Sequence, residues 1–160
     1  MIKNIKSNEK TAMISIHEIF KAASDEEHGA LKIQEIQNEY PNINEIKNGE
    51  GWSALHLAAY YGHLPAAKVL LENKANVNSE DLNGSTPLHK AAVCGNAKLV
   101  ELLLEKSSNI NAVNQDENTP LHLASLSGNL ETVKLLLEKC VDVKSFINAT
   151  NKKKETALHG

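Results

Sequence analysis

Apolar residues recur along most of the chain in short blocks that have the spacing of one helix face. The clearest block runs from Thr86 to Gly95, with apolar positions three and four residues apart, which predicts a short amphipathic helix. Thr86 is a suitable N-cap, and Pro87 suits the first helical position because no backbone N–H is needed there. Gly95 predicts the end of this helix, and Asn96 opens a second one. The apolar stripe of that second helix consists of Val100, Leu103 and Leu104.

The same two-helix pattern recurs without gaps at a spacing of 33 residues. Its copies begin with residues 51–59, 84–92 and 117–125, and each continues through a glycine into a second apolar block. A fourth copy starts at Glu155, and its histidine comes 37 residues after the preceding one, which indicates an insertion of four residues that we assign to 144–147. A two-helix unit of this size cannot bury its apolar stripe alone, so stacking of successive units into a solenoid is expected.

The repeated segments strongly resemble the ankyrin repeat. The T-P-L-H-x-A signature of that family stands at 86–91 and 119–124, and variants of it stand at 53–58 and 156–159. The resemblance implies an all-α fold, an ankyrin-repeat solenoid of stacked helix-turn-helix units joined by β-hairpin-like loops. A weaker match upstream, with Ala22 and Ala23 in the place of a repeat's alanine pair, is expected to form an N-terminal cap with a polar outer face.

The repeat period predicts the division of the chain into units. We expect a disordered N-terminal tail, a degenerate capping repeat, two regular repeats, one repeat with the four-residue insertion and the start of a truncated repeat. Their bounds are 1–13, 14–47, 48–83, 84–116, 117–150 and 151–160. The last unit stops inside its first helix, so we expect the chain to be incomplete at its C-terminus. On this hypothesis the outer apolar face of the third repeat is partly exposed around Leu121, Leu136 and Leu137.

Three positions depart from the family pattern in a way that affects stability. The glycine that usually ends the second helix is replaced by Lys74, Ser107 and Cys140. A side chain in the left-handed conformation costs about 1–2 kcal/mol. We therefore expect each of the three to be strained and the solenoid to be only marginally stable.

Composition and charge narrow the classes of partner. The chain carries 17 lysines, no arginine and a net charge of −3 at pH 7, which argues against nucleic-acid binding and against arginine-based phosphate recognition. No apolar run approaches the length that spans a bilayer, and no secretion signal is evident, so we expect a cytoplasmic protein without a membrane partner. Cys94 and Cys140 have no zinc or disulfide spacing. The lysine- and asparagine-rich composition also raises the hypothesis of an intracellular bacterial protein exported into a host cell.

The seven histidines do not indicate a metal site or a catalytic site. Four of them occur once per repeat, and stacked units hold such side chains too far apart to share a metal ion. In the family this imidazole bonds to the residue that opens the helix, which implies pairs of His56 with Ser53, His89 with Thr86 and His122 with Thr119. No nucleophile motif or glycine-rich phosphate loop is present. We therefore expect no enzyme activity, no metal, no cofactor and no small-molecule substrate.

The resemblance instead implies protein binding on a concave surface formed by the hairpin tips and the first helices. Carried over position by position, the expected partner-binding residues are Trp52, Tyr60, Tyr61, Leu82, Asn83, Ser85, Val93, Cys94, Gln115, Asp116, Asn118, Leu126 and Ser127. Exposed aromatic residues are frequent hot spots of interfaces, so Tyr60 and Tyr61 are the favoured anchors. In the alternative interpretation, Trp52 merely covers the hairpin and one tyrosine packs on the cap.

Three further points stay open at the level of sequence. Phe146 could contact a partner or tuck under the lengthened hairpin, and we favour the second. The leading function is a non-enzymatic protein–protein interaction module; the alternative is a targeting or regulatory segment of a larger protein with an effector or catalytic domain beyond residue 160. The resemblance also implies that Asn78 and Asn111 could be hydroxylated.

Overall fold

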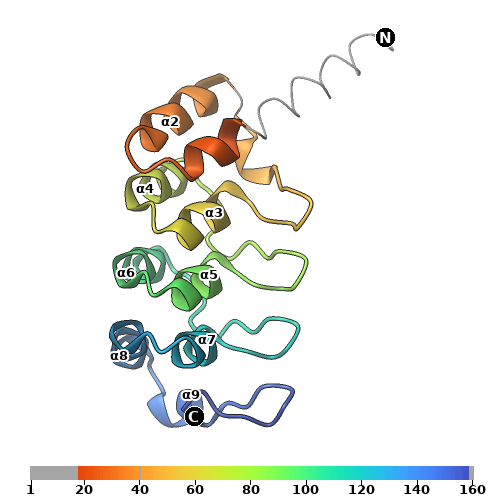
Figure 1. The fold of residues 1–160 in the computed structure, drawn as a ribbon, viewed down its shortest axis with the longest axis vertical. Coiled ribbons are helices and arrows are strands. Elements are labelled where there is room, and N and C mark those ends of the chain that lie inside the picture. Colours follow the sequence, from red (N-terminus) through yellow and green to blue (C-terminus); the bar gives the residue numbers. More distant parts are fainter. Residues whose placement is uncertain (1–17, 40, 159–160) are drawn as a thin grey trace.

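The computed structural model describes residues 18–39 and 41–158, which form a stack of helical pairs with loops projecting to one side (Figure 1). Residues 18–23 are helical, and the described part of the chain contains helices but no strand. The helices are α2 (Gly29–Glu39), the 3-10 helix η1 (Ile43–Glu45), α3 (Ala54–Tyr61), α4 (Leu64–Glu72), α5 (Pro87–Cys94), α6 (Ala97–Glu105), α7 (Pro120–Leu126), α8 (Leu130–Lys139) and α9 (Val143–Asn148). The expected all-α solenoid is confirmed. The expected tail at 1–13 and the histidine at 159 lie outside the described residues.

The first helices α3, α5 and α7 begin where the sequence predicts, and α3 and α5 also end there. Ser53, Thr86 and Thr119 are the N-caps of α3, α5 and α7. Gly62 and Gly95 end α3 and α5 in the left-handed conformation, with φ of 75° and 72°. Because both signals are local, each repeat folds its first helix from its own residues.

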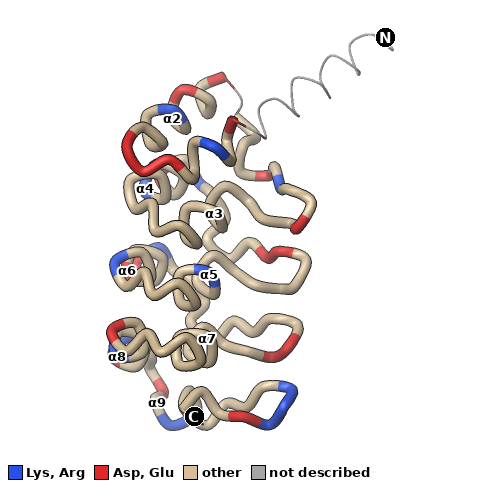
Figure 2. The backbone as a smooth tube through the Cα atoms, in the orientation of Figure 1, with Lys and Arg blue, Asp and Glu red and all other residues tan. Residues whose placement is uncertain are grey.

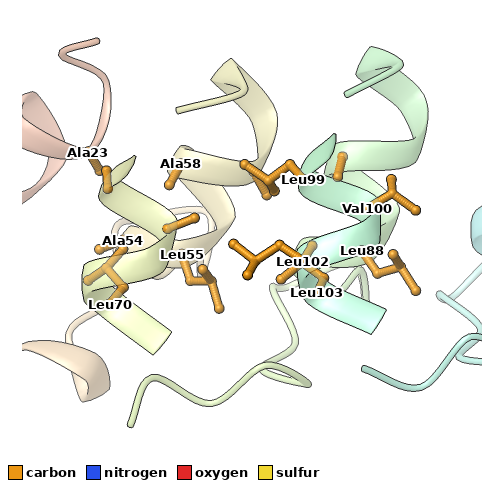
Figure 3. Packing of buried hydrophobic residues seen from close by; sticks show 14 of the residues in the cluster. Ala23, Ala54, Leu55, Ala58, Leu70, Leu88, Leu99, Val100, Leu102 and Leu103 are labelled. Carbon is orange, nitrogen blue, oxygen red and sulfur yellow. The ribbon is translucent and has the colours of Figure 1, made fainter. Parts of the chain in front are cut away.

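The core is a continuous layer of small and branched side chains between successive helix pairs (Figure 3). First helices stack on first helices, α3 on α5 and α5 on α7, while α2, α4, α6 and α8 stack as the second layer. The alanine pairs of α3 and α5, at 58–59 and 91–92, are fully buried. Their lack of bulk lets neighbouring helices approach closely, and Leu70, Leu103 and Leu136 fill the space toward the second layer.

The loops between repeats are hairpin turns held by one residue each. In the hairpin before α5, the Asp81 carboxylate accepts hydrogen bonds from the backbone N–H groups of Asn83 and Ser85, both at 2.9 Å. The side-chain oxygens of Asn48, Asn114 and Asn151 do the same in the other hairpins. Consecutive hairpins are joined by backbone bonds, such as the 3.1 Å bond from the Leu82 N–H to the Glu50 carbonyl. The loops are therefore hairpin-like without forming a sheet.

The expected backbone strain is present at two of the three positions. Lys74 and Ser107 both have φ of 67° and are left-handed. Cys140 has φ −76° and ψ 143°, so the expectation of a left-handed residue there is wrong. The physical reason is that the chain leaves α8 in an extended conformation and starts α9 three residues later. Glu117 is left-handed as well, with φ of 60°, at the position held by glycine in the two preceding hairpins.

The segment after α8 covers the third repeat more completely than the sequence suggests. Residues 144–147, assigned to the insertion, lie inside α9, whose Phe146 is only 3% exposed. The interpretation that Phe146 is tucked inward is confirmed, but the residues around it form a helix and not a lengthened hairpin. Leu121 and Leu136 are fully buried, contrary to expectation, and belong to the same core as Phe146 and Ala157, while Leu137 is half-buried as expected.

The N-terminal unit has the features of a cap. Ala22 and Ala23 are buried, as the alanine pairs of the other repeats are. The polar outer face expected of it carries five exposed charged residues, Lys21, Glu26, Glu27, Lys32 and Glu35. None of the helices in the described segments is long and apolar enough to cross a membrane.

Candidate protein-binding surface

We use the name hairpin face for the surface made by the hairpins that start at Asn48, Asp81, Asn114 and Asn151, together with the exposed sides of α3, α5 and α7. In Figure 1 these loops lie side by side next to the first helices. The hydrogen bonds between neighbouring hairpins hold them at a constant spacing. The face therefore presents a series of equivalent positions, and its character depends on which side chains occupy them.

The hairpin face carries an aromatic cluster in the first regular repeat, formed by Trp52, Tyr60, Tyr61 and His63. The Trp52 and Tyr60 ring centroids are 5.3 Å apart, and those of Tyr60 and Tyr61 are 5.2 Å apart with the planes at 84°. The tyrosine side chains stay accessible, at 39% and 55% exposure, while Trp52 is half-buried. The two tyrosine rings pack edge to face and the tryptophan ring is tilted against Tyr60, an arrangement that fixes their orientation before any partner arrives.

A buried ion pair adjoins this cluster. The Lys90 ammonium nitrogen lies 2.7 Å from the Asp81 carboxylate and 4.3 Å from the centroid of the Trp52 ring. The Asp81 side chain is fully buried and that of Lys90 is 13% exposed. One lysine thus joins the second hairpin, helix α5 and the first repeat's tryptophan, combining an ion pair with a cation–π contact.

The surroundings of Asp81 keep its carboxyl group charged. Burial alone would raise the pKa of Asp81, but the hydrogen bonds from Lys90 and from the backbone N–H groups of Ser85 and Asn83 outweigh it, so the pKa lies below its ordinary value. The negative charge of Asp81 is therefore compensated inside the structure. It is not available to a partner.

The other expected contacts divide into exposed and structural residues. On the hairpin face the exposed ones are Leu82, Asn83, Cys94, Gln115, Asp116, Leu126 and Ser127, while Val93 is half-buried. Ser85 is only 6% exposed, contrary to the expectation that it is a surface contact, because its backbone bonds to Asp81 and His56. Asn118 is half-buried, and its side-chain oxygen accepts a hydrogen bond from Asn151.

The repeated histidines link neighbouring units. The pairs that the resemblance implies are confirmed, with the ring Nδ1 atoms 2.8–2.9 Å from the hydroxyls of Ser53, Thr86 and Thr119. The Nε2 atom of His56 donates to the Ser85 carbonyl at 2.9 Å, and the Nε2 atoms of His89 and His122 bond to the hairpin of the next unit. Burial lowers the pKa of His56 to about 4 and lowers that of His89 as well. These imidazoles are structural donors.

Neither the histidines nor the acids of the described residues form a group of three that could hold a metal ion. A hollow of ≈ 510 Å³ lies between α7 and residues 151–158, at the far end of the array from the aromatic cluster.

Asn78, a residue considered for hydroxylation, uses its side-chain oxygen to accept a hydrogen bond from the Asn109 N–H at 2.8 Å. Asn111 is exposed.

Sequence reasoning missed the Asp81–Lys90 pair and the inter-repeat amides. Lys90 stands where the neighbouring repeats have Leu57 and Leu123, so the irregularity itself was a readable signal. Asn96 was identified only as a helix start, but its amide donates to the Ala59 carbonyl of the preceding repeat at 3.0 Å. Asn129 makes the equivalent bonds one repeat later.

Comparison with known proteins agrees with this geometry. "Ankyrin repeats (3 copies)" matches residues 19–114, and "Ankyrin repeats (many copies)" matches residues 95–137. The chain is 30% identical over 90 residues to the E3 ubiquitin-protein ligase MIB2 of Gallus gallus, which covers 49% of this chain and 9% of that protein.

Two further relatives show similar partial matches. The potassium channel AKT3 of Oryza sativa subsp. japonica is 36% identical over 62 residues, 39% of this chain and 7% of the channel. The ankyrin repeat and SAM domain-containing protein 6 of Mus musculus is 44% identical over 49 residues, 31% of this chain and 6% of that protein. The chain thus spans less than a tenth of the length of each of these relatives. Repeat period, helix stacking and family match agree, and the chain belongs to the ankyrin-repeat family.

Proposed function

We propose that this chain is a non-enzymatic protein-binding module whose hairpin face holds a protein partner, with the aromatic cluster at the energetic centre. Ankyrin repeats are in general non-catalytic interaction modules that bind protein partners, which supports the class of function. The observation that carries the location is the exposure of Tyr60 and Tyr61 on a pre-stacked cluster.

The physical basis is the low entropic cost of ordering these rings at an interface. A tyrosine combines a large apolar area with few rotatable bonds, so ordering it at an interface costs little entropy. Tyr60, held by Trp52, and Tyr61, held by Tyr60, lose still less freedom on binding. Aromatic anchors of this kind, when central, each contribute about 2 kcal/mol or more to affinity.

A variant that removes both rings tests the location. Tyr60→Ala with Tyr61→Ala is expected to weaken capture of partners by at least about tenfold, since roughly 1.4 kcal/mol corresponds to that factor. The matched control is Leu31→Ala with Val141→Ala, two apolar residues that are 71% and 104% exposed and lie off the hairpin face. Circular dichroism of both variants reports whether the helices persist. Equal partner binding by the aromatic variant and the control would contradict the proposal.

A second candidate is a targeting or regulatory segment within a larger protein that carries an effector or catalytic domain. The observation in its favour is that the similar segments make up 9%, 7% and 6% of a ligase, a channel and a SAM-domain protein. The reading frame of the gene around these residues distinguishes the two candidates. A frame that encodes nothing outside the repeats would rule out the second one.

A further inference from the structure

We propose that the hairpin face selects a basic peptide segment in an extended conformation, with lysine or arginine side chains placed over the aromatic cluster and the first three hairpins. This inference rests on the proposed function and adds the chemistry of the partner. It is carried by the distribution of charge along the hairpins, by the cation already seated on Trp52 and by the spacing of the repeats.

Charge along the hairpin face is divided into two zones. The acidic zone, on the hairpins that start at Asn48, Asp81 and Asn114, has exposed carboxylates at Glu50, Glu80, Asp116 and Glu117. The basic zone, on the last hairpin, has exposed lysines at 152, 153 and 154. In Figure 2 each of the first three of these loops carries a red segment, and the tip of the last loop is blue.

The acidic zone is not neutralised from within the described segments. None of its four carboxylates forms an ion pair there; the pairs that occur are on the capping unit and between Lys90 and Asp81. Lys47, the nearest lysine in sequence to these hairpins, donates to the backbone carbonyl of Glu80 at 2.6 Å. The carboxylates thus remain free to attract a positively charged partner from solution.

A contact within the chain shows that the aromatic cluster can hold a cation. The Lys90 ammonium sits over the Trp52 ring and against the Asp81 carboxylate, so a π face next to a carboxylate already holds a cation here. Tyr60 and Tyr61 continue the same cluster toward solvent, and the described residues place no cation over either ring. A lysine or arginine of a partner fits these two faces by the same chemistry.

The spacing of the repeats favours an extended partner. Packed helices lie about 8–10 Å apart, and a chain in the extended polyproline II conformation advances about 3.1 Å per residue with about three residues per turn. One repeat therefore corresponds to about three residues of partner. Side chains at every third position of such a segment point the same way and reach equivalent places on successive hairpins. We expect basic residues at positions i, i+3 and i+6, with the apolar residues between them free to meet Leu82 and Leu126, which are 66% and 84% exposed.

A displayed library of random peptides of about 12 residues, panned on the full chain, tests this inference. Enrichment of lysine and arginine at three-residue spacing is expected. The affinity of the best peptide should fall at least about tenfold between about 50 and about 500 mM salt, because the Debye length shortens about threefold over that range. Glu50→Lys with Asp116→Lys should lower that affinity at least about tenfold, by the loss of charge complementarity. The matched control, Glu72→Lys with Glu101→Lys, reverses two exposed acids on α4 and α6 and should leave it unchanged.

The outcomes separate this inference from the proposed function. If neutral or acidic peptides are enriched, and Tyr60→Ala with Tyr61→Ala abolishes their binding, the basic-partner inference is overturned while the proposed function stands. Enrichment that neither the aromatic nor the hairpin variants affect overturns both. A library that yields no binder overturns the extended-peptide inference, and the partner-capture experiment then decides the proposed function alone.

Discussion

At the scale of single residues, the second regular repeat carries a matched pair of exchanges relative to its neighbours. Two positions of each repeat matter here: the residue that starts the hairpin, and the residue nine positions later in the first helix. They are occupied by Asn48 and Leu57 in one repeat, and by Asn114 and Leu123 in another. In the repeat between them they are Asp81 and Lys90, which form the buried ion pair beneath Trp52. A charge introduced at either position alone would be buried without compensation, so the two residues depend on each other.

This dependence predicts a strong coupling between two substitutions. Lys90→Leu leaves the Asp81 carboxylate buried without its partner and is expected to lower the free energy of unfolding by about 2 kcal/mol, between the values typical of exposed and buried pairs. Adding Asp81→Asn recreates the Asn and Leu combination of the adjacent repeats and should restore about 1–2 kcal/mol. Urea denaturation of the two single variants and the double variant measures the coupling. Purely additive losses would show that the pair is incidental.

At the scale of elements, the helix ends determine where strain is stored. Second helices α4 and α6 are each followed two residues later by a left-handed side chain, Lys74 and Ser107, and the turn closes by a bond from the next N–H back into the helix. After α8 the chain instead takes the extended path that leads into α9. The same position of the repeat therefore has two conformations, and the difference arises from the next segment of the chain, a hairpin in two repeats and a helix in the third.

Glycine substitutions at these helix ends should change the free energy of unfolding in opposite directions. Ser107→Gly relieves a left-handed side chain, and after the added entropy of the unfolded glycine the free energy of unfolding should rise by about 0.5–1 kcal/mol. Cys140→Gly brings no such relief, because φ there is −76°, and should lower it by about 0.5–1 kcal/mol. Thermal and urea unfolding of both variants provide the measurement. A stabilising Cys140→Gly would show that this turn is left-handed in solution.

At the scale of the whole molecule, the histidines add a further set of hydrogen bonds between repeats to the packing and the hairpin bonds. Each ring is fixed by the cap of its own helix and bonds to the hairpin of the next unit. Asn96 and Asn129 make parallel links between turns of neighbouring repeats. Because these bonds cross every boundary between the regular repeats, protonation of the histidines affects the entire stack.

Acidification should therefore weaken the fold within a defined window. The pKa of His56 is about 4 in the folded chain and about 6.5 when unfolded, so the unfolded state takes up protons first as pH falls. The stability it supports is complete above pH 6.5 and is lost progressively down to about pH 4, by roughly 3 kcal/mol for this residue. The pKa of His89 is also lowered, which adds to the slope. The contribution of Asp81, whose pKa lies below 3.8, is lost only at lower pH.

Urea denaturation at several pH values measures how the free energy of unfolding depends on pH. The useful range is about pH 4 to about pH 7, where the folded and unfolded states differ in the number of bound protons. His56→Gln should reduce the pH dependence even though it lowers stability at neutral pH. A slope that is the same in the wild type and in His56→Gln would show that the buried imidazole is not the responsible group.

Most of the fold could be predicted from the sequence because its determinants are local and repeated. Caps such as Thr86, left-handed glycines such as Gly95 and the alanine pairs act within one unit, and repetition every 33 residues makes each signal readable several times. The expected histidine pairs follow from the same local geometry. Exposure of Tyr60 and Tyr61 was also expected from their place in the repeat.

How side chains from different units meet became clear only from the packing of the repeats. The contact of Lys90 with Trp52 and the burial of Ser85 against His56 depend on the distance between neighbouring repeats, which no single unit contains. The conformation of Cys140 likewise depends on α9 and on the burial of Phe146. The repeating unit follows from the amino-acid sequence alone, because that unit is set by short-range hydrogen bonds and helical spacing. The surface chemistry was decided by packing between units, because contacts across a boundary require both neighbours to be in place.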